Sequence, residues 1–294
     1  MSARILDGRI VAADIRNEVS RRIAEHLVRH GPIRLCAILV GDDPAARLYA
    51  QSQRRRCQQA GVQHELVELP GDINQERLIA RLEELNRDPD VTGIMLQLPL
   101  PDQIDAAAAQ YHIDPYKDVE GVNPANIGLL FYDEPIIAPC TALAVMEMIR
   151  RAEAPVRGAE AVVVGQSRIV GRPISMFLTT QMATVTACHA ATRDLRNHTR
   201  DADILVVAVG KPGLIDGSFI KPGAIVIDVG INSVETVNAA GERIRRTVGD
   251  VAFDSAAKVA GAITPVPGGV GPVTVAMLLR NTVEAAEKQL HRKL

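Results

Sequence analysis

The sequence has no strong excess of charge of either sign. Its 33 basic and 35 acidic residues nearly cancel, which leaves a formal net charge of −2. Nonspecific binding to nucleic acid depends on a strongly positive field around the protein. The composition therefore argues against a nucleic-acid partner, and the three consecutive arginines at positions 54–56 are better explained as a solvated helix face.

Long apolar runs are also missing. No run approaches the roughly 20 residues that a membrane-spanning helix requires. The first residues, MSARILDGRIVAADIR, carry a charge every few positions and do not resemble a signal peptide. We therefore expect a soluble, cytoplasmic protein with no membrane partner.

Cysteine is scarce, and the four residues lie far apart with no C-x-x-C spacing. That pattern favours neither a zinc site nor a disulfide framework, and no metal site is predicted. Each cysteine is instead expected to be a small, buried, apolar residue. The four positions are Cys36, Cys57, Cys140 and Cys188.

What the chain does contain is enough apolar sequence for a sizeable core. It has 294 residues, of which 47% are hydrophobic, so one large α/β domain or two ordinary ones can form. From residue 33 onward, short β-rich runs alternate with helical stretches, a pattern typical of a parallel sheet with helices on its faces. The predicted strands are 33–40, 63–69 and 91–97, and the predicted helices are 44–61 and 74–87.

A second series of the same kind begins near residue 161. Its four β-rich runs are apolar on both faces, as interior parallel strands are, so two α/β units are predicted. A helix is expected near 141–153, between the two series. The closing helix at 275–290 has apolar residues at helical spacing and is expected to dock on the first unit. The predicted strands of the second series are 161–165, 184–188, 204–210 and 224–230, with a helix near 172–182.

The turn after the first of these strands has the composition of a phosphate loop. In GQSRIVGRP, Gly165 and Gly171 flank Ser167, and Pro173 leads into the helix. Glycines there let the backbone approach a pyrophosphate, and the helix N-terminus supplies N–H groups and a positive dipole end. The spacing departs from G-x-G-x-x-G, so by itself the loop is equally consistent with an ordinary strand-to-helix turn.

The second strand of this unit ends without the acidic residue that usually holds the ribose of NAD. His189 is followed there by two alanines, while Arg168 and Arg193 are the cationic side chains that could reach a 2′-phosphate. NADP is therefore favoured as the cofactor, with NAD as the alternative. His189 is interpreted as a cofactor-wall or packing residue rather than as an acid–base catalyst.

Several ordered stretches, taken together, carry a resemblance to one family. They are GDDPAARLY (41–49), QLPLP (97–101), PYKDVEGVNPANIG (115–128), GQSRIVGRP (165–173), VGKPG (209–213), IDVGIN (227–232) and TPVPGGVGPVT (264–274). With these motifs the chain closely resembles the bifunctional methylenetetrahydrofolate dehydrogenase/cyclohydrolase family, from about residue 4 to about residue 287. The motifs are many and uncommon in other proteins.

The resemblance implies a homodimer that binds tetrahydrofolate derivatives in the cleft between two domains of each chain. Residues 1–140 with 274–294 would form the catalytic folate-binding domain, and residues 141–273 a Rossmann-type domain that carries NADP or, less often, NAD. By position, the cofactor-binding residues would be Gly165, Gln166, Ser167, Arg168, Gly171 and Ile231. The loop that lines the folate and nicotinamide pocket would include Pro267, Gly268, Gly269, Gly271 and Pro272.

The catalytic positions that the resemblance implies contain substitutions. The family carries Tyr-x-x-x-Lys on one helix face; Tyr49 matches it, but Gln53 stands at the lysine position. Gln97 matches the family's glutamine before Leu-Pro. Glu120 replaces an aspartate whose carboxylate pairs with pterin N–H donors, and its extra methylene moves the carboxylate by roughly 1.5 Å. The family's serine before the tyrosine is replaced by an alanine, and two more alanines depart from P-C-T-P-x-G: Ala46, Ala142 and Ala144.

The glutamine has a chemical consequence. In the family, dehydrogenation chiefly requires that folate and nicotinamide be positioned, whereas cyclohydrolysis requires a proton shuttle near the folate nitrogens. A glutamine amide has no proton to exchange near neutral pH, so we expect a methylenetetrahydrofolate dehydrogenase with weak or absent cyclohydrolase activity. The alternatives are a fully bifunctional enzyme, a non-catalytic folate- or nucleotide-binding regulatory paralogue, and a dehydrogenase that acts on another one-carbon carrier.

Overall fold

The computed structural model describes residues 2–237 and 242–292, and the chain divides into two compact α/β units. The six-stranded unit comprises Met1–Ala13 and Thr141–Val275, and the three-stranded unit comprises Asp14–Cys140 and Ala276–Leu294. Two long helices, α1 (Gly8–His30) and α10 (Val270–Arg292), contribute residues to both units. The predicted class, two α/β units with mainly parallel strands, is confirmed.

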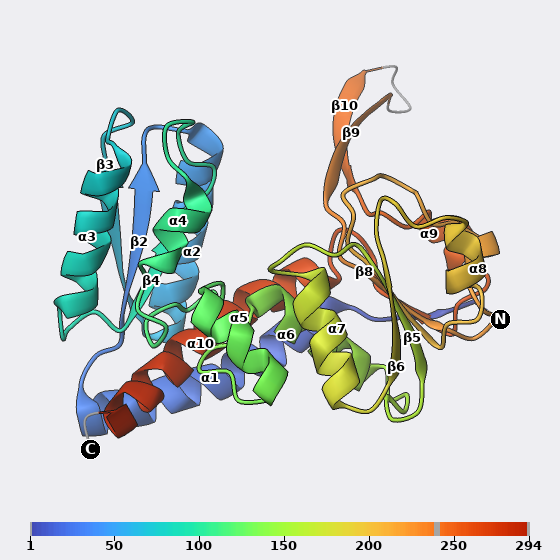
Figure 1. Cartoon of the computed structure of the whole chain (residues 1–294), viewed down its shortest axis with the longest axis horizontal. Helices are drawn as coiled ribbons and strands as arrows, with labels where there is room; N and C mark the ends of the chain where they lie inside the picture. The colour runs from blue at the N-terminus through green and yellow to red at the C-terminus, as the bar shows by residue number, and fades with distance from the viewer. Residues whose placement is uncertain (1, 238–241, 293–294) are drawn as a thin grey trace. The chain divides into compact units, whose positions relative to one another are not determined.

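The three-stranded unit has the parallel strand order β3-β2-β4 (Figure 1). The central strand is buried along almost its whole length, which explains its continuous apolar sequence. Helix α2 begins where the side chain of Asp43 caps it and ends at Gly61, which adopts a left-handed conformation with φ of 90°. The bounds are β2 (Arg34–Val40), α2 (Pro44–Ala60), β3 (Gln63–Leu69), α3 (Gln75–Arg87) and β4 (Gly93–Leu96).

The core of this unit forms between the sheet and α3. Leu78, Leu82 and Leu85 recur at helical spacing and pack against apolar side chains of β2 and β4. Short helical segments follow β4 in the chain. They are α4 (Ala106–Tyr111), α5 (Pro124–Leu129) and a 3₁₀ turn at Leu130–Tyr132.

The six-stranded unit has the order β1-β11-β8-β7-β5-β6, and all its pairs are parallel. The prediction that all four runs are interior strands is wrong for β6, because it lies at the sheet edge and most of its residues are at least partly exposed. The sheet strands are β1 (Arg4–Ile5), β5 (Glu160–Val164), β6 (Thr184–Cys188), β7 (Ile204–Val207), β8 (Ile225–Asp228) and β11 (Ala262–Ile263). The other elements are α6 (Cys140–Arg151), α7 (Gly171–Thr180), α8 (Leu195–Thr199), α9 (Phe253–Ala256) and a 3₁₀ turn at Gly217–Phe219.

Three features were not anticipated from the sequence. An antiparallel hairpin of β9 (Asn232–Val237) and β10 (Arg243–Val248) follows β8. Helix α1 precedes the first predicted strand. The first strand, which the expected boundaries assigned to the folate-binding domain, is hydrogen-bonded to β11 in the six-stranded sheet.

The closing helix begins five residues earlier than predicted. Gly271 and Pro272 therefore lie in the first turn of α10 and not in a loop. A proline is tolerated there because the first N–H groups of a helix have no intrahelical partner. From Ala276 onward the helix belongs to the three-stranded unit, where Gln289 donates to the carbonyls of Thr92 and Tyr116. The predicted docking of this helix on the first unit is confirmed.

All four cysteines are buried, as predicted. Among the described helices, none combines the length and apolar character needed to cross a membrane.

Candidate active site

Two buried glutamines lie at the centre of the predicted catalytic positions in the three-stranded unit. Gln53 lies one turn after Tyr49 on α2, so both side chains share a helix face. Gln97 follows β4 directly, and its N–H donates to the carbonyl of Ile38 at 2.9 Å. The Nε2 of Gln97 donates to the Oε1 of Gln53 at 2.9 Å, and the two residues are 2% and 3% exposed. The structure thus brings these two predicted residues into direct contact.

Gln53 has two further neighbours that the sequence reasoning missed. Its Nε2 donates to the sulfur of Met95 on β4. The Nε2 of His64, on β3, lies 3.3 Å from the Oε1 of Gln53. The alternation of residues in the strand QHELVEL could have indicated the contact with His64. It places His64 and Leu66 on one face of β3, and this face meets α2.

Tyr49 and Glu120 lie near each other at the same end of the unit. Tyr49 is 44% exposed, and partial burial together with the nearby Glu120 carboxylate raises the pKa of its phenol. Burial raises the pKa of Glu120 to about 8, and the neighbouring Asp118 adds to the shift, while the backbone N–H of Leu96 opposes it. This shift favours the protonated form of Glu120 in the free protein at neutral pH.

The turn that carries Glu120 is fixed by buried polar groups. Asp118 accepts hydrogen bonds from the backbone of Asn123 at 2.7 Å and from the side chain of Asn126 at 3.0 Å. From α10, the Nδ2 of Asn281 donates to the carbonyls of Val119 and Ala138, each at 2.9 Å. These bonds tie the segments on either side of Glu120 to the closing helix.

The three alanines at positions where the resemblance implies other residues are buried in helices. Ala46 lies in the first turn of α2, where its N–H donates to the Asp43 cap at 2.7 Å. Ala142 and Ala144 lie in α6. The methyl group of Ala46 does not supply the polar group that a serine would supply. The methyl group of Ala142 does not supply the backbone restriction of a proline.

The phosphate-loop residues form a cradle at the end of β5. A Cβ atom on Gly165 would lie 2.1 Å from the carbonyl oxygen of Ala208, and one on Gly171 would lie 1.8 Å from that of Gly165. Only glycine fits at either position. Helix α7 begins at Gly171 with no side-chain cap, and Ser167 and Arg168 are exposed beside it. This open helix end, bordered by closely approaching backbone, fits the pyrophosphate of a dinucleotide.

The side chain of Gln166 turns back toward the protein. Its Nε2 donates to the carbonyl of Val163 at 3.2 Å and to the hydroxyl of Ser175 at 3.5 Å. It therefore braces the loop against β5 and α7.

Ile231 and the proline–glycine loop lie close together in the six-stranded unit. Ile231 is 70% exposed, and its Cδ1 lies 3.9 Å from where a Cβ of Gly271 would be. The loop, which contains Pro267, Gly268 and Gly269, packs against the start of α1. The N–H of Gly8 donates to the carbonyl of Gly268 at 2.8 Å, and a Cβ on Gly8 would lie only 1.7 Å from the carbonyl oxygen of Gly269. Gly8 was not predicted to take part.

Two buried aspartates, also not predicted, organise the loops around Ile231. Asp228, at the end of β8, accepts backbone hydrogen bonds from Gly230, Asp250 and Val251 at 2.9–3.0 Å. Asp250 in turn accepts from the N–H groups of Val209 and Gly210 at 2.7 and 3.0 Å. Burial raises the pKa of Asp228 to about 6, although its backbone hydrogen bonds oppose the shift. Together the two carboxylates connect the segments after β7, β8 and β10.

His189 is exposed and bonds within its own turn, where its Nδ1 accepts from the N–H of Ala191 at 3.2 Å. Across residues 2–237 and 242–292, no group of three or more His, Cys, Asp or Glu side chains is arranged to hold a metal ion.

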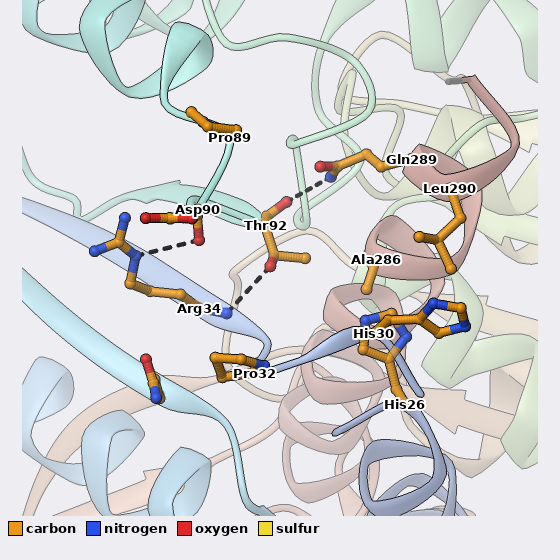
Figure 2. Close-up of a pocket in the computed structure, with 11 residues that line it drawn as sticks. His26, His30, Pro32, Arg34, Pro89, Asp90, Thr92, Ala286, Gln289 and Leu290 are labelled. Atoms are coloured by element: carbon orange, nitrogen blue, oxygen red, sulfur yellow. Dashed lines mark hydrogen bonds between the residues drawn. The ribbon is translucent and has the colours of Figure 1, made fainter. Parts of the chain in front are cut away.

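A separate pocket lies at the amino ends of the strands in the three-stranded unit and contains none of the predicted site residues. Figure 2 shows that several of its polar groups bond to one another: Arg34 donates from its side chain to the carbonyl of Asp90 and from its backbone to the hydroxyl of Thr92. Gln289 donates to the carbonyl of Thr92. The pocket is lined by His26, His30, Pro32, Arg34, Gln63, Pro89, Asp90, Thr92, Ala286, Gln289 and Leu290.

Comparison with protein families gives two matches in chain order. Residues 6–120 match the catalytic domain of tetrahydrofolate dehydrogenase/cyclohydrolase, and residues 139–290 match the NAD(P)-binding domain of the same family. The chain belongs to the tetrahydrofolate dehydrogenase/cyclohydrolase family.

Individual members of the family are similar over almost their whole length. The bifunctional protein FolD of Bordetella petrii is 50% identical over 286 residues, which cover 97% of this chain and 95% of that protein. The Trypanosoma brucei methylenetetrahydrofolate dehydrogenase-cyclohydrolase, solved with NADP and an inhibitor, has a TM-score of 0.91 and 40% identity over 99% of each chain. The Campylobacter jejuni FolD enzyme has a TM-score of 0.89 and 39% identity over 98% of this chain and 100% of its own.

Family membership identifies the kind of fold that contains the glycine cradle. The cradle lies within the matched NAD(P)-binding domain, so the loop that was ambiguous in the sequence belongs to a dinucleotide-binding fold. The buried glutamine pair and Glu120 lie within the matched catalytic domain.

The raised pKa of Glu120 predicts how this family member responds to pH. The folded protein binds a proton at Glu120 up to about pH 8, whereas an unfolded chain releases it near pH 4.3. Stability therefore falls as pH rises between these values. We expect Glu120→Gln, which resembles the protonated acid, to have a higher Tm than the wild type at pH 9, with the difference shrinking toward pH 5.

Thermal unfolding of both proteins between pH 5 and pH 9 measures this difference. Glu76→Gln, at an exposed position in the first turn of α3, removes the same charge and should show no comparable pH-dependent gain. An unchanged or lowered Tm for Glu120→Gln at pH 9 would contradict the burial argument.

The backbone hydrogen bonds that Asp228 accepts predict that a substitution of this residue destabilises the six-stranded unit. Asp228→Asn replaces one acceptor oxygen with an amide that faces a backbone N–H, so a buried donor is left without a partner. We expect a loss of about 1–3 kcal/mol in unfolding free energy, measured by urea denaturation. Asp216→Asn, an exposed cap that accepts from the backbone of Ser218, is the matched control. Equal losses in the two variants would show that burial of Asp228 is unimportant.

Proposed function

We propose that this protein is an NAD(P)-dependent methylenetetrahydrofolate dehydrogenase whose methenyltetrahydrofolate cyclohydrolase activity is weak or absent. The observation that carries the proposal is the buried amide of Gln53, bonded to Gln97, at the position where the resemblance implies a lysine. Relatives named as bifunctional support the dehydrogenase half.

The two reactions make different demands on the catalytic unit. Bound NAD(P) supplies the hydride acceptor for dehydrogenation. The protein then chiefly has to hold the folate in place and exclude water, which requires shape and hydrogen bonds but no proton carrier. Gln53 and Gln97 meet that requirement as neutral hydrogen-bonding groups.

Cyclohydrolysis adds water and opens a ring, so protons have to move near the folate nitrogens. The Gln53 amide cannot exchange a proton near neutral pH. Arg54 is adjacent, but its guanidinium holds its proton too tightly, and one step along a helix turns a side chain by roughly 100°. Loss of a positioned acid–base group typically reduces a rate by roughly 10²–10⁴.

Glu120 is proposed to pair with the N–H donors of the pterin. Its carboxyl group has to lose its proton to accept two such bonds, and donors on the ligand favour that ionised form. Tyr49, half-exposed beside it, would form part of the wall for the same ligand.

We propose NADP as the preferred cofactor. In the described part of the chain, Arg168 and Arg193 are exposed and form no ion pair, so both guanidinium groups remain available for a 2′-phosphate. No acidic residue follows β6 directly, where one would repel that phosphate. Assembly as a homodimer in the cytoplasm, with tetrahydrofolate derivatives as substrates, completes the proposal.

Separate assays of the two reactions test the main proposal. We expect the purified protein to reduce NADP with methylenetetrahydrofolate, while its hydrolysis of methenyltetrahydrofolate is about 10²-fold or more below that of the Bordetella petrii protein assayed in parallel. Equal hydrolysis rates would favour the fully bifunctional alternative. Folate binding without reduction of either cofactor would favour the regulatory alternative.

The cofactor preference is tested by arginine variants. We expect Arg168→Ala or Arg193→Ala to raise the KM for NADP about tenfold, because a charge-assisted hydrogen bond to the phosphate is lost, and to leave the KM for NAD unchanged. Arg196→Ala is the control, since Arg196 donates to the carbonyl of Ser218. Equal changes for both cofactors, or none in either variant, would contradict the assignment.

A further inference from the structure

His64 is a titratable side chain in contact with the Gln53 amide, which stands where the resemblance implies a lysine. It reaches Gln53 from β3, while Gln97 reaches the same oxygen from the end of β4. We propose that His64 is a positioning residue of the folate site, which, as a neutral imidazole donating from Nε2, holds the Gln53 amide in one orientation. This inference rests on the proposed function, because it assigns a role at the same site.

The hydrogen-bonding geometry selects one form of the imidazole. The Oε1 of Gln53 can only accept, so the Nε2 of His64 has to carry a proton. The Nδ1 of His64 is buried and has no hydrogen-bond partner among residues 2–237 and 242–292. A proton at Nδ1 would therefore be a buried donor without an acceptor, which is unfavourable both in the other neutral tautomer and in the imidazolium. Burial and the neighbouring Arg54 also lower the pKa of His64, although the backbone of His64 itself opposes the shift.

Two donors on one oxygen determine which way the Gln53 amide faces. With His64 and Gln97 both donating to Oε1, the nitrogen has to point to the other side, where it donates to Met95. A flipped amide would place N–H groups against two other donors. The three side chains come from α2, β3 and the end of β4, so the amide is held from separate elements.

The same geometry argues that His64 does not replace the missing lysine as a proton carrier. Its only proton is used in the bond to Gln53, and its free lone pair at Nδ1 is enclosed by protein. A proton leaving His64 would have to pass through an amide that does not exchange it. His64 therefore acts through Gln53, and its effect should disappear when the amide is removed.

A double-mutant cycle tests this dependence. The variants are Gln53→Ala, His64→Leu and the double variant, with the folate KM and kcat of dehydrogenation measured in each. We expect His64→Leu to raise the folate KM about 3- to 10-fold, the ratio for one lost hydrogen bond, with kcat changed less. In the Gln53→Ala background the same change should have no further effect. His64→Gln, which keeps an N–H donor, should retain most of the wild-type KM.

Three kinetic outcomes would overturn the proposal: an equal effect of His64→Leu in both backgrounds, no change in KM for Gln53→Ala, or a His64→Gln variant as impaired as His64→Leu. An acid limb in the pH profile of the wild type that His64→Gln abolishes would indicate a proton carrier instead. If His64→Leu does not fold, ¹⁵N chemical shifts of the wild-type imidazole decide the matter. A neutral Nε2–H tautomer at pH 7 is expected, and a protonated or Nδ1–H ring would overturn the proposal.

These outcomes are distinguishable from failure of the proposed function. A protein that reduces neither cofactor would refute the dehydrogenase, yet the tautomer of His64 would still be measurable. A fully active cyclohydrolase would refute the loss of hydrolysis, and the cycle on dehydrogenation would still show whether His64 acts through Gln53.

Discussion

The hydrogen bond between Gln97 and Gln53 is the contact on which the catalytic unit depends. It joins α2 to the end of β4 inside a region from which water is almost excluded, so each amide has to find its partners within the protein. A lysine at position 53 would bring a charge to be stabilised there. A glutamine needs only complementary donors and acceptors, and His64, Gln97 and Met95 supply them. The surroundings are therefore matched to a neutral group.

The six-stranded unit holds its candidate site with buried carboxylates that accept hydrogen bonds from backbone N–H groups. Its site consists of backbone segments at the carboxyl ends of parallel strands, where loops after β7, β8 and β10 have to be held in fixed positions. Asp228 and Asp250 do this by accepting backbone N–H groups from several segments at once. Glycines contribute by allowing close backbone approach at the phosphate loop. In both units, buried polar side chains hold the segments that carry the candidate site residues.

Much of the fold could be predicted because its pattern is local. Buried parallel strands read as apolar runs, and helices between them have helical spacing, so β2, β3, β5, β7 and β8 appeared where expected. The edge position of β6 was missed because strand order depends on which helices cross which face, and its short sequence resembles that of an interior strand. The β9–β10 hairpin was missed because β10 is rich in arginine and mostly exposed, so no apolar core face marks it.

The sequence by itself determined the chemical kinds of groups at the candidate site: the amides of Gln53 and Gln97, the carboxyl group of Glu120, and a glycine-rich turn after a strand. Motif order was enough for that, because those residues are adjacent in the chain or fit a known spacing. Only the tertiary structure decided what the groups do to one another. His64 and Gln53 are eleven positions apart on different elements, and a hydrogen bond between them depends on how α2 packs against β3. The pKa of Glu120 likewise depends on burial and on Asp118, which no residue pattern expresses.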